Sequence, residues 1–237
     1  MLDIFKKPII GIISRVDSDR DGDEVICIME DYRRAILKKQ AIPFLLLPPQ
    51  DIVYDSLRPR EAERLKEAEK EYLRNIVDMC DGILIPGGHK WYEYDEYIYE
   101  YAYLKNMPIL GICAGMQMMA CMDNGRALDM TIKNETILNH HQKLEKYVHN
   151  VDIIENSFLK NILKTSKIRV NSRHNYHVNK VNNLKISAIS EDGLIEAIEA
   201  PNKKFILGVQ WHPESMLEYD EYANKIFDEF IKNCQKS

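Results

Sequence analysis

The sequence predicts an α/β fold in which a mostly parallel central sheet lies between layers of helices. Short apolar runs alternate with amphipathic, charged segments over residues 1–125, which is the spacing of strand–helix–strand units. The strand-like runs are apolar throughout, as in strands that are covered on both faces. With 237 residues and 45% hydrophobic content, the chain is long enough to bury a large core.

The first half of the chain supplies the predicted parallel strands and the helices between them. The strands are short runs rich in Ile and Leu, and two of them end at prolines or glycines: residues 8–14, 42–47, 82–85 and 109–112. The helices are amphipathic or rich in charge pairs spaced i,i+4: residues 30–40, 60–79, 94–105 and 114–122. Residues 15–24 are polar and predict a loop.

The second half of the chain has shorter strand-like runs separated by turn residues such as Asp192-Gly193. This spacing predicts antiparallel strands added to the edge of the sheet, at residues 148–154, 168–171, 184–190, 194–199 and 205–210. Residues 219–232 predict a closing amphipathic helix. Neither a linker composition nor a repeat marks a boundary, so we expect one domain over residues 1–237.

Composition and charge exclude several classes of function. The net charge is -5, from 32 basic and 37 acidic residues, and no dense Lys/Arg patch predicts a nucleic-acid partner. No apolar run reaches the ~18–20 residues of a transmembrane helix, and the apolar part of residues 1–8 is too short for a signal peptide. The five irregularly spaced cysteines predict reduced thiols, and we expect a cytoplasmic protein without a membrane partner.

Cys113 is the candidate nucleophile. It follows the apolar run 109–112 and precedes a helix-favouring segment, and Gly111 and Gly115 flank it in the pattern G-x-C-x-G. This is the thiol form of the nucleophile elbow, a strand-to-helix turn that needs small neighbours. The turn places the side chain at a helix N-terminus, which favours a thiolate.

A cysteine nucleophile needs a base and a group that orients the base. Among seven histidines, His212 follows the strand-like run 205–210, and Pro213 restricts its backbone to an extended form. Glu214, two residues further on, can hold one ring nitrogen while the other faces the thiol. Backbone N–H groups of Gly87, Gly88 and Ala114 are the candidate donors of an oxyanion hole.

These motifs together resemble the class I glutamine amidotransferase-like hydrolases. The segments that carry the likeness are Pro86-Gly-Gly88, Gly111-Ile-Cys-Ala-Gly-Met-Gln117 and Gly208-Val-Gln-Trp-His-Pro-Glu214. Three further segments make the resemblance more specific, to the γ-glutamyl-γ-aminobutyrate hydrolase branch, peptidase family C26. They are residues 7–12, 170–174 and 191–199. The resemblance spans nearly the whole chain.

The resemblance implies a flavodoxin-like three-layer α/β/α sandwich with Cys113, His212 and Glu214 as the catalytic triad. It implies hydrolysis of a γ-glutamyl amide through a thioester on Cys113, which releases glutamate and an amine. It also implies contacts with the glutamyl head, partly through backbone groups, and the residues that would make them are Gln117, Ser172, Arg173 and His174.

The chain departs from the family pattern away from the triad. Ala114 stands where Arg is common after the cysteine, Asn175-Tyr176 replace a His-Gln pair, and His89 begins a segment that differs from the usual Asp and proline loop. These departures put the γ-aminobutyrate leaving group in question more than the γ-glutamyl group. The aromatic segment 91–103 leaves two interpretations open: a helix that packs some of its tyrosines against the sheet, or a pocket entrance at which Trp91 and Tyr92 select the amine.

Three hypotheses about the function stay open. The protein is a free-standing γ-glutamyl amide hydrolase, a glutaminase subunit that passes ammonia to a synthase, or a non-catalytic binding protein on the same fold. The sequence indicates neither a synthase partner nor the oligomeric state, so a homo-oligomer stays open. The dinucleotide-binding and Walker patterns are absent, and we expect no cofactor. We also expect no metal site, since adjacent His140 and His141 are poor joint ligands.

Overall fold

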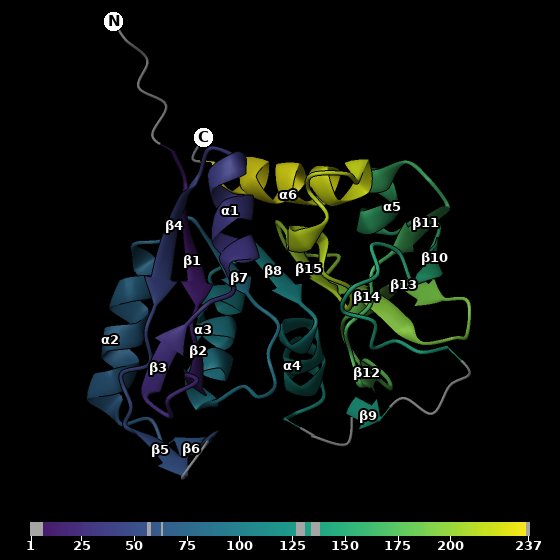
Figure 1. The fold of residues 1–237 in the computed structure, drawn as a ribbon. Helices are drawn as coiled ribbons and strands as arrows, with labels where there is room; N and C mark the ends of the chain where they lie inside the picture. Colours follow the sequence, from purple (N-terminus) through teal and green to yellow (C-terminus); the bar gives the residue numbers. More distant parts are fainter. Residues whose placement is uncertain (1–6, 56–57, 63, 127–130, 134–137, 236–237) are drawn as a thin grey trace, which may run out of the picture.

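The computed structural model describes residues 7–55, 58–62, 64–126, 131–133 and 138–235, and one large sheet organises them (Figure 1). The sheet consists of β1 (Ile9–Ile13), β4 (Ile42–Leu46), β7 (Gly82–Ile85), β8 (Ile109–Ile112), β9 (Thr131–Lys133), β10 (His149–Ile153), β11 (Lys167–Val170), β12 (Tyr176–Val178), β13 (Lys185–Ser190), β14 (Ile195–Glu199) and β15 (Ile206–Val209). Its main order is β11-β10-β13-β14-β15-β8-β7-β1-β4, and β12 pairs with β14 and β9.

The strands β4, β1, β7, β8 and β15 run parallel to one another, and β14, β13, β10 and β11 extend the sheet from β15 in antiparallel pairs. The expectation that the run 205–210 joins the antiparallel edge is therefore wrong in part. β15 lies in the middle of the sheet and pairs parallel with β8. All its residues are buried, as a strand covered on both faces requires.

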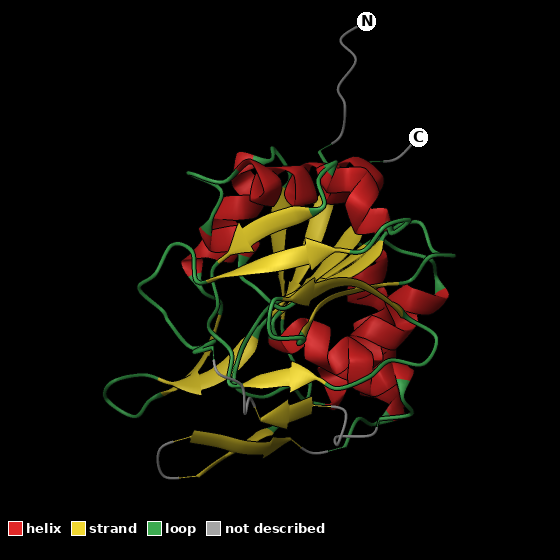
Figure 2. Ribbon diagram, turned by 90° about the vertical axis from the view of Figure 1, so that its right-hand side faces the viewer, coloured by secondary structure: helices red, strands yellow, loops and turns green. Residues whose placement is uncertain are grey.

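Helices cover both faces of the sheet, and Figure 2 shows the strands between the two helical layers. One layer is α1 (Glu30–Lys38), α5 (Phe158–Leu163) and α6 (Glu221–Cys234), and the other is α2 (Glu67–Asp78), α3 (Glu93–Leu104) and α4 (Ala114–Asp123). Alternate residues of one strand enter different cores, since Leu110 and Ile112 pack with the first layer and Ile109 with the second. The three-layer α/β/α prediction is confirmed.

Two segments differ from their predictions. The polar run 15–24 forms a hairpin of β2 (Arg15–Ser18) and β3 (Glu24–Cys27), because Asp19 Oδ1 accepts N–H groups of Asp21 and Asp23 and closes a tight turn. The helix predicted from residue 60 begins at Glu67 instead. β5 (Ile52–Asp55) and β6 (Arg58–Ala62) precede it. Glu69 Oε2 accepts Lys66 N–H at 2.7 Å, and this hydrogen bond caps the start of the helix.

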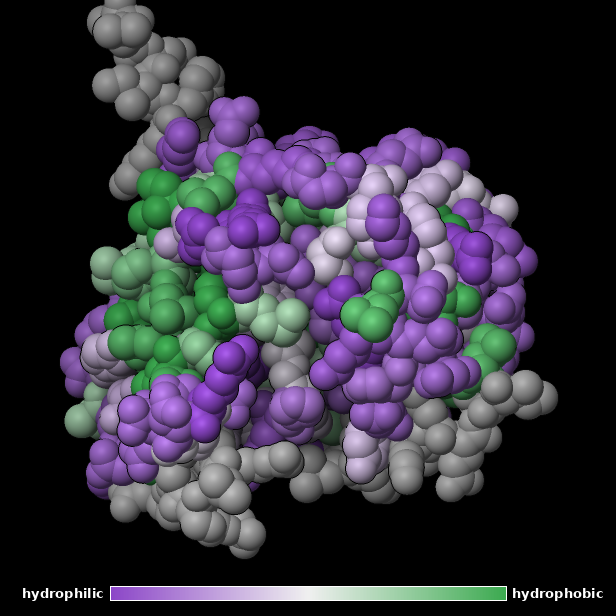
Figure 3. Space-filling model, in the orientation of Figure 1, coloured by the Kyte–Doolittle hydropathy of each residue, from purple (hydrophilic) through white to green (hydrophobic). Residues whose placement is uncertain are grey.

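Apolar side chains remain on the surface over the edge strand β4, where Figure 3 shows a continuous hydrophobic area. Ile42, Leu45 and Leu47 are each more than a third exposed there. Among the described helices, none combines the length and the apolar character that crossing a bilayer would need.

Candidate active site

Cys113 lies at the sharp turn between β8 and α4. Its backbone has φ +53° and ψ -108°, a conformation that costs a non-glycine residue about 1–3 kcal/mol and is concentrated at functional sites. The helix begins at the next residue, and Gln117 N–H donates to Cys113 O at 3.0 Å. The sulfur therefore lies at the N-terminus of α4, where the helix dipole stabilises negative charge.

The glycine after the cysteine allows α4 to pack directly against β7. A Cβ atom at Gly115 would lie 2.2 Å from Ile85 O, far closer than a Cβ atom approaches a non-bonded backbone atom. A larger residue would push the helix away from the sheet and displace Cys113. The small residue that the elbow pattern requires is thus explained by a close approach between two backbones.

The pairing of β15 with β8 brings His212 to the same edge of the sheet as Cys113. Val209 is in register with Ile112, and Cys113 N–H donates to Val209 O at 2.8 Å. His212 follows three residues later, and its imidazole lies beside the Cys113 side chain. Its Nδ1 lies 2.6 Å from Glu214 Oε1, and both side chains are buried. The structure therefore brings the three predicted triad residues together in the order Cys, His, Glu.

The neighbours of His212 favour its charged form. Burial opposes the charge, but Glu214 and Cys113 outweigh it and raise the pKa of His212 to about 10. The imidazolium therefore persists at neutral pH between a carboxylate and the cysteine sulfur. Because the folded pKa exceeds the ordinary value of 6.5, this interaction stabilises the fold fully below that pH, and the stabilisation is lost as the pH rises through about 10.

Asn171 holds the backbone of His212 from the antiparallel part of the sheet. It is fully buried at the end of β11. Its Oδ1 accepts His212 N–H at 2.8 Å, and its Nδ2 donates to His212 O at 2.9 Å. This role of Asn171 could not be predicted from the sequence, because no local pattern shows that β11 ends beside the chain after β15.

The two glycines after β7 have different environments. Gly87 N–H donates to the hydroxyl of Tyr32, 2.8 Å away, so this N–H is already occupied within the protein. Burial, reinforced by Glu214, raises the pKa of Tyr32 well above 10, which keeps the phenol neutral. Gly88 instead lines a pocket together with Cys113 and Ala114. Of the two glycines, we therefore retain Gly88 as the candidate oxyanion donor, beside Ala114.

A buried arginine fixes the position of this glycine turn. Arg15 Nε donates to Gly87 O at 3.1 Å, Arg15 Nη2 donates to Pro86 O, and Arg15 Nη1 pairs with Asp95. The Asp95 carboxylate is fully buried and also accepts Tyr92 N–H at 2.9 Å. Arg15 and Asp95 thus join β2, the glycine turn and α3. Neither residue was predicted from the sequence, although Arg15 directly follows the predicted strand 8–14.

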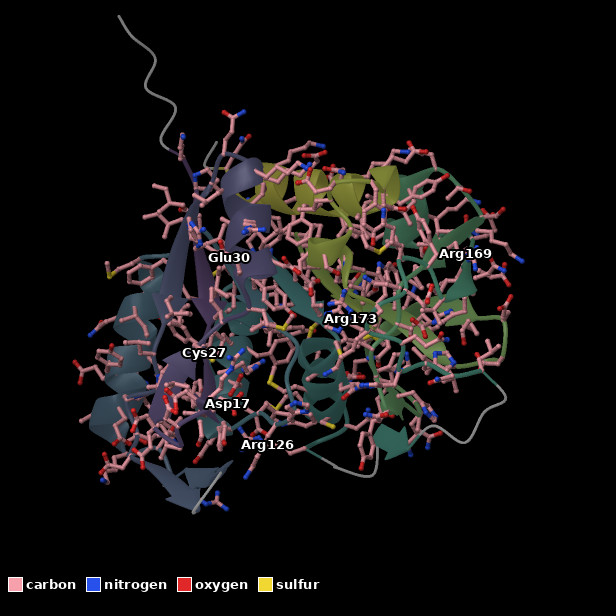
Figure 4. The ribbon with its side chains drawn as sticks, in the orientation of Figure 1. Asp17, Cys27, Glu30, Arg126, Arg169 and Arg173 are labelled. Carbon is pink, nitrogen blue, oxygen red and sulfur yellow. The ribbon has the colours of Figure 1, made fainter. Side chains whose placement is uncertain are left out.

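The pocket above Cys113 has a volume of about 350 Å³. The predicted substrate residues Gln117, Arg173 and His174 line it, and Figure 4 shows Arg173 in the middle of the molecule. Ser172 is fully buried and donates to His140 O at 2.7 Å, so it supports the pocket wall from behind. The described lining residues are Met29, Gly88, His89, Trp91, Cys113, Ala114, Gln117, His141, Lys143, Arg173, His174, Asn175, Tyr176 and His212.

The pocket suits an anionic ligand. Lys143 and Arg173 contribute positive charge, and no acidic side chain occurs among the described lining residues. Within the part of the chain that the structure describes, Arg173 Nε is buried and makes no hydrogen bond. Trp91 lines the pocket as expected, whereas Tyr92 lies in a neighbouring depression with Arg126.

Comparisons with known proteins agree with this geometry. The family model for peptidase C26 matches residues 89–214. A glutamine amidotransferase-like protein of Rickettsia prowazekii is 32% identical over 62% of this chain and 74% of its own length. The γ-glutamyl-γ-aminobutyrate hydrolase PuuD of Escherichia coli is 27% identical over 99% of this chain and 96% of its own. The glutaminase domain of Trypanosoma brucei CTPS, solved with acivicin, superimposes with a TM-score of 0.66 at 19% identity, covering 96% of this chain and 94% of that domain.

Proposed function

Because the chain belongs to the peptidase C26 family of glutamine amidotransferase-like proteins, we propose that it hydrolyses γ-glutamyl amide bonds with Cys113 as nucleophile. One arrangement supports this function above all. The buried chain of Cys113, His212 and Glu214 opens into a pocket whose charged side chains are basic. A γ-glutamyl group carries an α-carboxylate that this pocket can bind.

In the proposed reaction, the Cys113 sulfur attacks the γ-carbonyl carbon. Negative charge develops on the carbonyl oxygen, where the N–H groups of Gly88 and Ala114 stabilise it. As the C–N bond breaks, the departing amine takes the proton from the His212 imidazolium and leaves a γ-glutamyl thioester. His212 then removes a proton from water, which attacks the thioester and releases glutamate and the cysteine.

The pocket wall suits the glutamyl head of this substrate. Arg173 and Lys143 would bind its α-carboxylate, and a guanidinium can do so with two parallel hydrogen bonds. Gln117 lines the same wall, with its Nε2 donating to Tyr176 O at 2.8 Å. The amine side would lie toward Trp91 and His89, where the chain departs from the family pattern.

A second candidate is a glutaminase subunit that delivers ammonia to a synthase. The exposed apolar area of Ile42 and Leu45 on β4 and Leu47 directly after it favours this function, because a partner protein could cover this surface. A second copy of this chain could cover it equally well. The third hypothesis, a non-catalytic binding protein, has less support, since the buried His212–Glu214 ion pair beside a cysteine is costly to retain without a use.

One panel of substrates separates these functions. The purified protein is assayed with glutamine, γ-glutamyl-γ-aminobutyrate, other γ-glutamyl amines and γ-glutamyl peptides, and released glutamate is measured. Turnover without a partner supports the hydrolase. Turnover of glutamine alone, increased by a second protein, supports the glutaminase subunit. No turnover and no acyl-enzyme by mass spectrometry with any substrate would overturn the proposal.

We expect Glu214→Gln to lower kcat by roughly 10²–10⁴-fold, less than loss of the nucleophile, because the acid orients and charges the base without touching the substrate. The amide also removes the charge that raises the pKa of His212. The alkaline limb of the kcat–pH profile should therefore move to lower pH. An unshifted limb would show that Glu214 does not set the charge of His212.

We expect Trp91→Ala to change the order of preference among γ-glutamyl amines, because their kcat/KM values should change by different factors. Trp91 is half-buried at the pocket wall, and its Nε1 donates to Glu96 Oε1 at 3.3 Å, which holds the ring in place. The kcat/KM values of the panel measure this effect. Tyr222→Ala on α6 is the control, because Tyr222 is absent from the described pocket lining. An unchanged ranking would remove Trp91 from substrate selection.

A further inference from the structure

A second group of chemically active side chains lies behind the pocket wall. It consists of His140, His149, His174 and Glu196, and is called the buried histidine–glutamate cluster below. One ligand atom from each residue lies within 4.8 Å of all the others. Their side chains are at most 1% exposed. The proposed hydrolysis uses none of these groups as acid, base or nucleophile.

The spacing of the cluster suits one small cation. Glu196 Oε1 lies 3.5 Å from His174 Nε2, 3.6 Å from His149 Nε2 and 3.9 Å from His140 Nδ1. Tetrahedral zinc binds nitrogen and oxygen at roughly 2.0–2.1 Å, which places its ligands about 3.3 Å apart. A small inward movement of each side chain would therefore bring all four atoms into coordination distance.

Each imidazole is oriented by an acceptor outside the cluster. His149 Nδ1 lies 3.2 Å from Asn150 O, and His174 Nδ1 lies 3.0 Å from Tyr176 O. His140 Nε2 lies 2.8 Å from Asp192 Oδ2, while its Nδ1 is 3.4 Å from Ser172 Oγ. When each outer nitrogen donates its hydrogen, the inner nitrogen presents a lone pair to the centre. Such outer partners are typical of histidines that bind a metal.

Glu196 accepts no hydrogen bond from outside the cluster within the described part of the chain. Both of its carboxylate oxygens are buried and neither makes a hydrogen bond there, and the same is true of His149 Nε2. Glu199, buried on the same strand, provides the comparison. Its oxygens accept Phe158 N–H at 2.7 Å and Leu159 N–H at 3.1 Å. A carboxylate buried without such donors is costly unless a cation lies beside it.

We propose that the buried histidine–glutamate cluster binds one divalent transition-metal ion, with zinc as the preferred occupant. Three imidazoles and one carboxylate are donors that suit zinc. Four protein ligands, each with a side chain at most 1% exposed, complete a tetrahedral shell and leave no position for a substrate, so the site is structural. It would replace the expectation from the sequence that the chain holds no metal.

The ion would fix the wall of the catalytic pocket. His174 N–H donates to His140 O at 3.0 Å, and His141 and Arg173 form an isolated β-bridge. Asn171, which holds the His212 backbone, lies three residues before His174. Binding at the cluster would thus join the segment before β10, β10 itself, the segment between β11 and β12, and β14.

Metal analysis of the full-length chain, purified without a histidine tag, tests the proposal. We expect one zinc ion per chain, and at least ~100-fold weaker zinc binding after Glu196→Gln or His149→Gln. His141→Gln is the matched control. It removes the histidine next to His140, which lines the pocket outside the cluster, and it should keep the metal.

Cobalt binding is measured on the wild-type protein. The measurement requires neither enzymatic turnover nor correct folding of variants at the ligand residues. The wild-type protein is stripped with a chelator and titrated with Co²⁺, which should produce the intense visible absorption of a tetrahedral site that zinc then abolishes. Wild-type protein that carries no zinc and shows no such absorption would overturn the proposal. Equal zinc affinity in Glu196→Gln, His149→Gln and the wild type would also overturn it. Neither result depends on whether γ-glutamyl amides are hydrolysed.

Discussion

Cys113→Ala is expected to abolish hydrolysis of γ-glutamyl amides, with a fall in kcat of roughly 10⁵-fold or more. Without the sulfur no thioester can form, and water alone must attack the amide. The fold should persist, because Cys113 is small and its backbone hydrogen bonds to Val209 and Gln117 do not involve the side chain. Released glutamate measures the rate, and urea unfolding measures the stability.

Cys121→Ala is the matched control for this prediction. Cys121 lies on α4, the helix that Cys113 precedes, and is also buried, but it is absent from the described pocket lining. Its substitution should leave turnover close to the wild-type value. Near-normal turnover in Cys113→Ala would show that another group is the nucleophile, and the proposed mechanism would then fail.

Asp95→Ala is expected to cause the largest loss of stability, about 3–5 kcal/mol in the free energy of unfolding. The substitution leaves the Arg15 guanidinium, only 13% exposed, without its carboxylate. It also removes the acceptor for Tyr92 N–H. Because Arg15 donates to the carbonyl groups of Pro86 and Gly87, turnover should fall as well. Urea unfolding measures the stability effect.

Asp78→Ala provides the exposed comparison for this pair. Asp78 and Lys105 form an ion pair on the surface, with side chains 44% and 43% exposed. Such pairs contribute about 0–1 kcal/mol, so the loss should be small. The double variant Arg15→Met with Asp95→Leu should recover much of the stability without restoring the glycine turn. A loss below about 1 kcal/mol in Asp95→Ala would show that Arg15 remains solvated.

Much of the fold could be predicted because its signals are local. The strands β7 and β8 begin and end at the predicted residues, since each is a short apolar run bounded by Pro, Gly or Cys. The nucleophile elbow and the His-Pro-Glu segment were found for the same reason. Residues 15–24 were predicted as a loop and residues 60–62 as helix, and both predictions were wrong. They relied on composition, whereas the turn at Asp19 and the helix cap at Lys66 determine the local structure.

The supporting residues could not be predicted, because they act across the sheet. Tyr32 reaches Gly87 from 55 residues away, and Asn171 reaches His212 from 41 residues away. Both contacts depend on which strands are neighbours, and a single sequence does not state that order. The position of β15 beside β8, instead of at the edge, decides where His212 lies.

The sequence by itself determined the α/β class, the strand-to-helix turn at Cys113 and the His212-Pro213-Glu214 segment, because each depends on neighbours within a few residues. Only the tertiary structure decided which groups surround them. It directed Gly87 N–H to Tyr32, buried Arg15 beneath the glycine turn, and gathered three separate histidines around Glu196. The physical reason is that burial and strand pairing bring distant polar groups together, and each must then find a partner inside the protein.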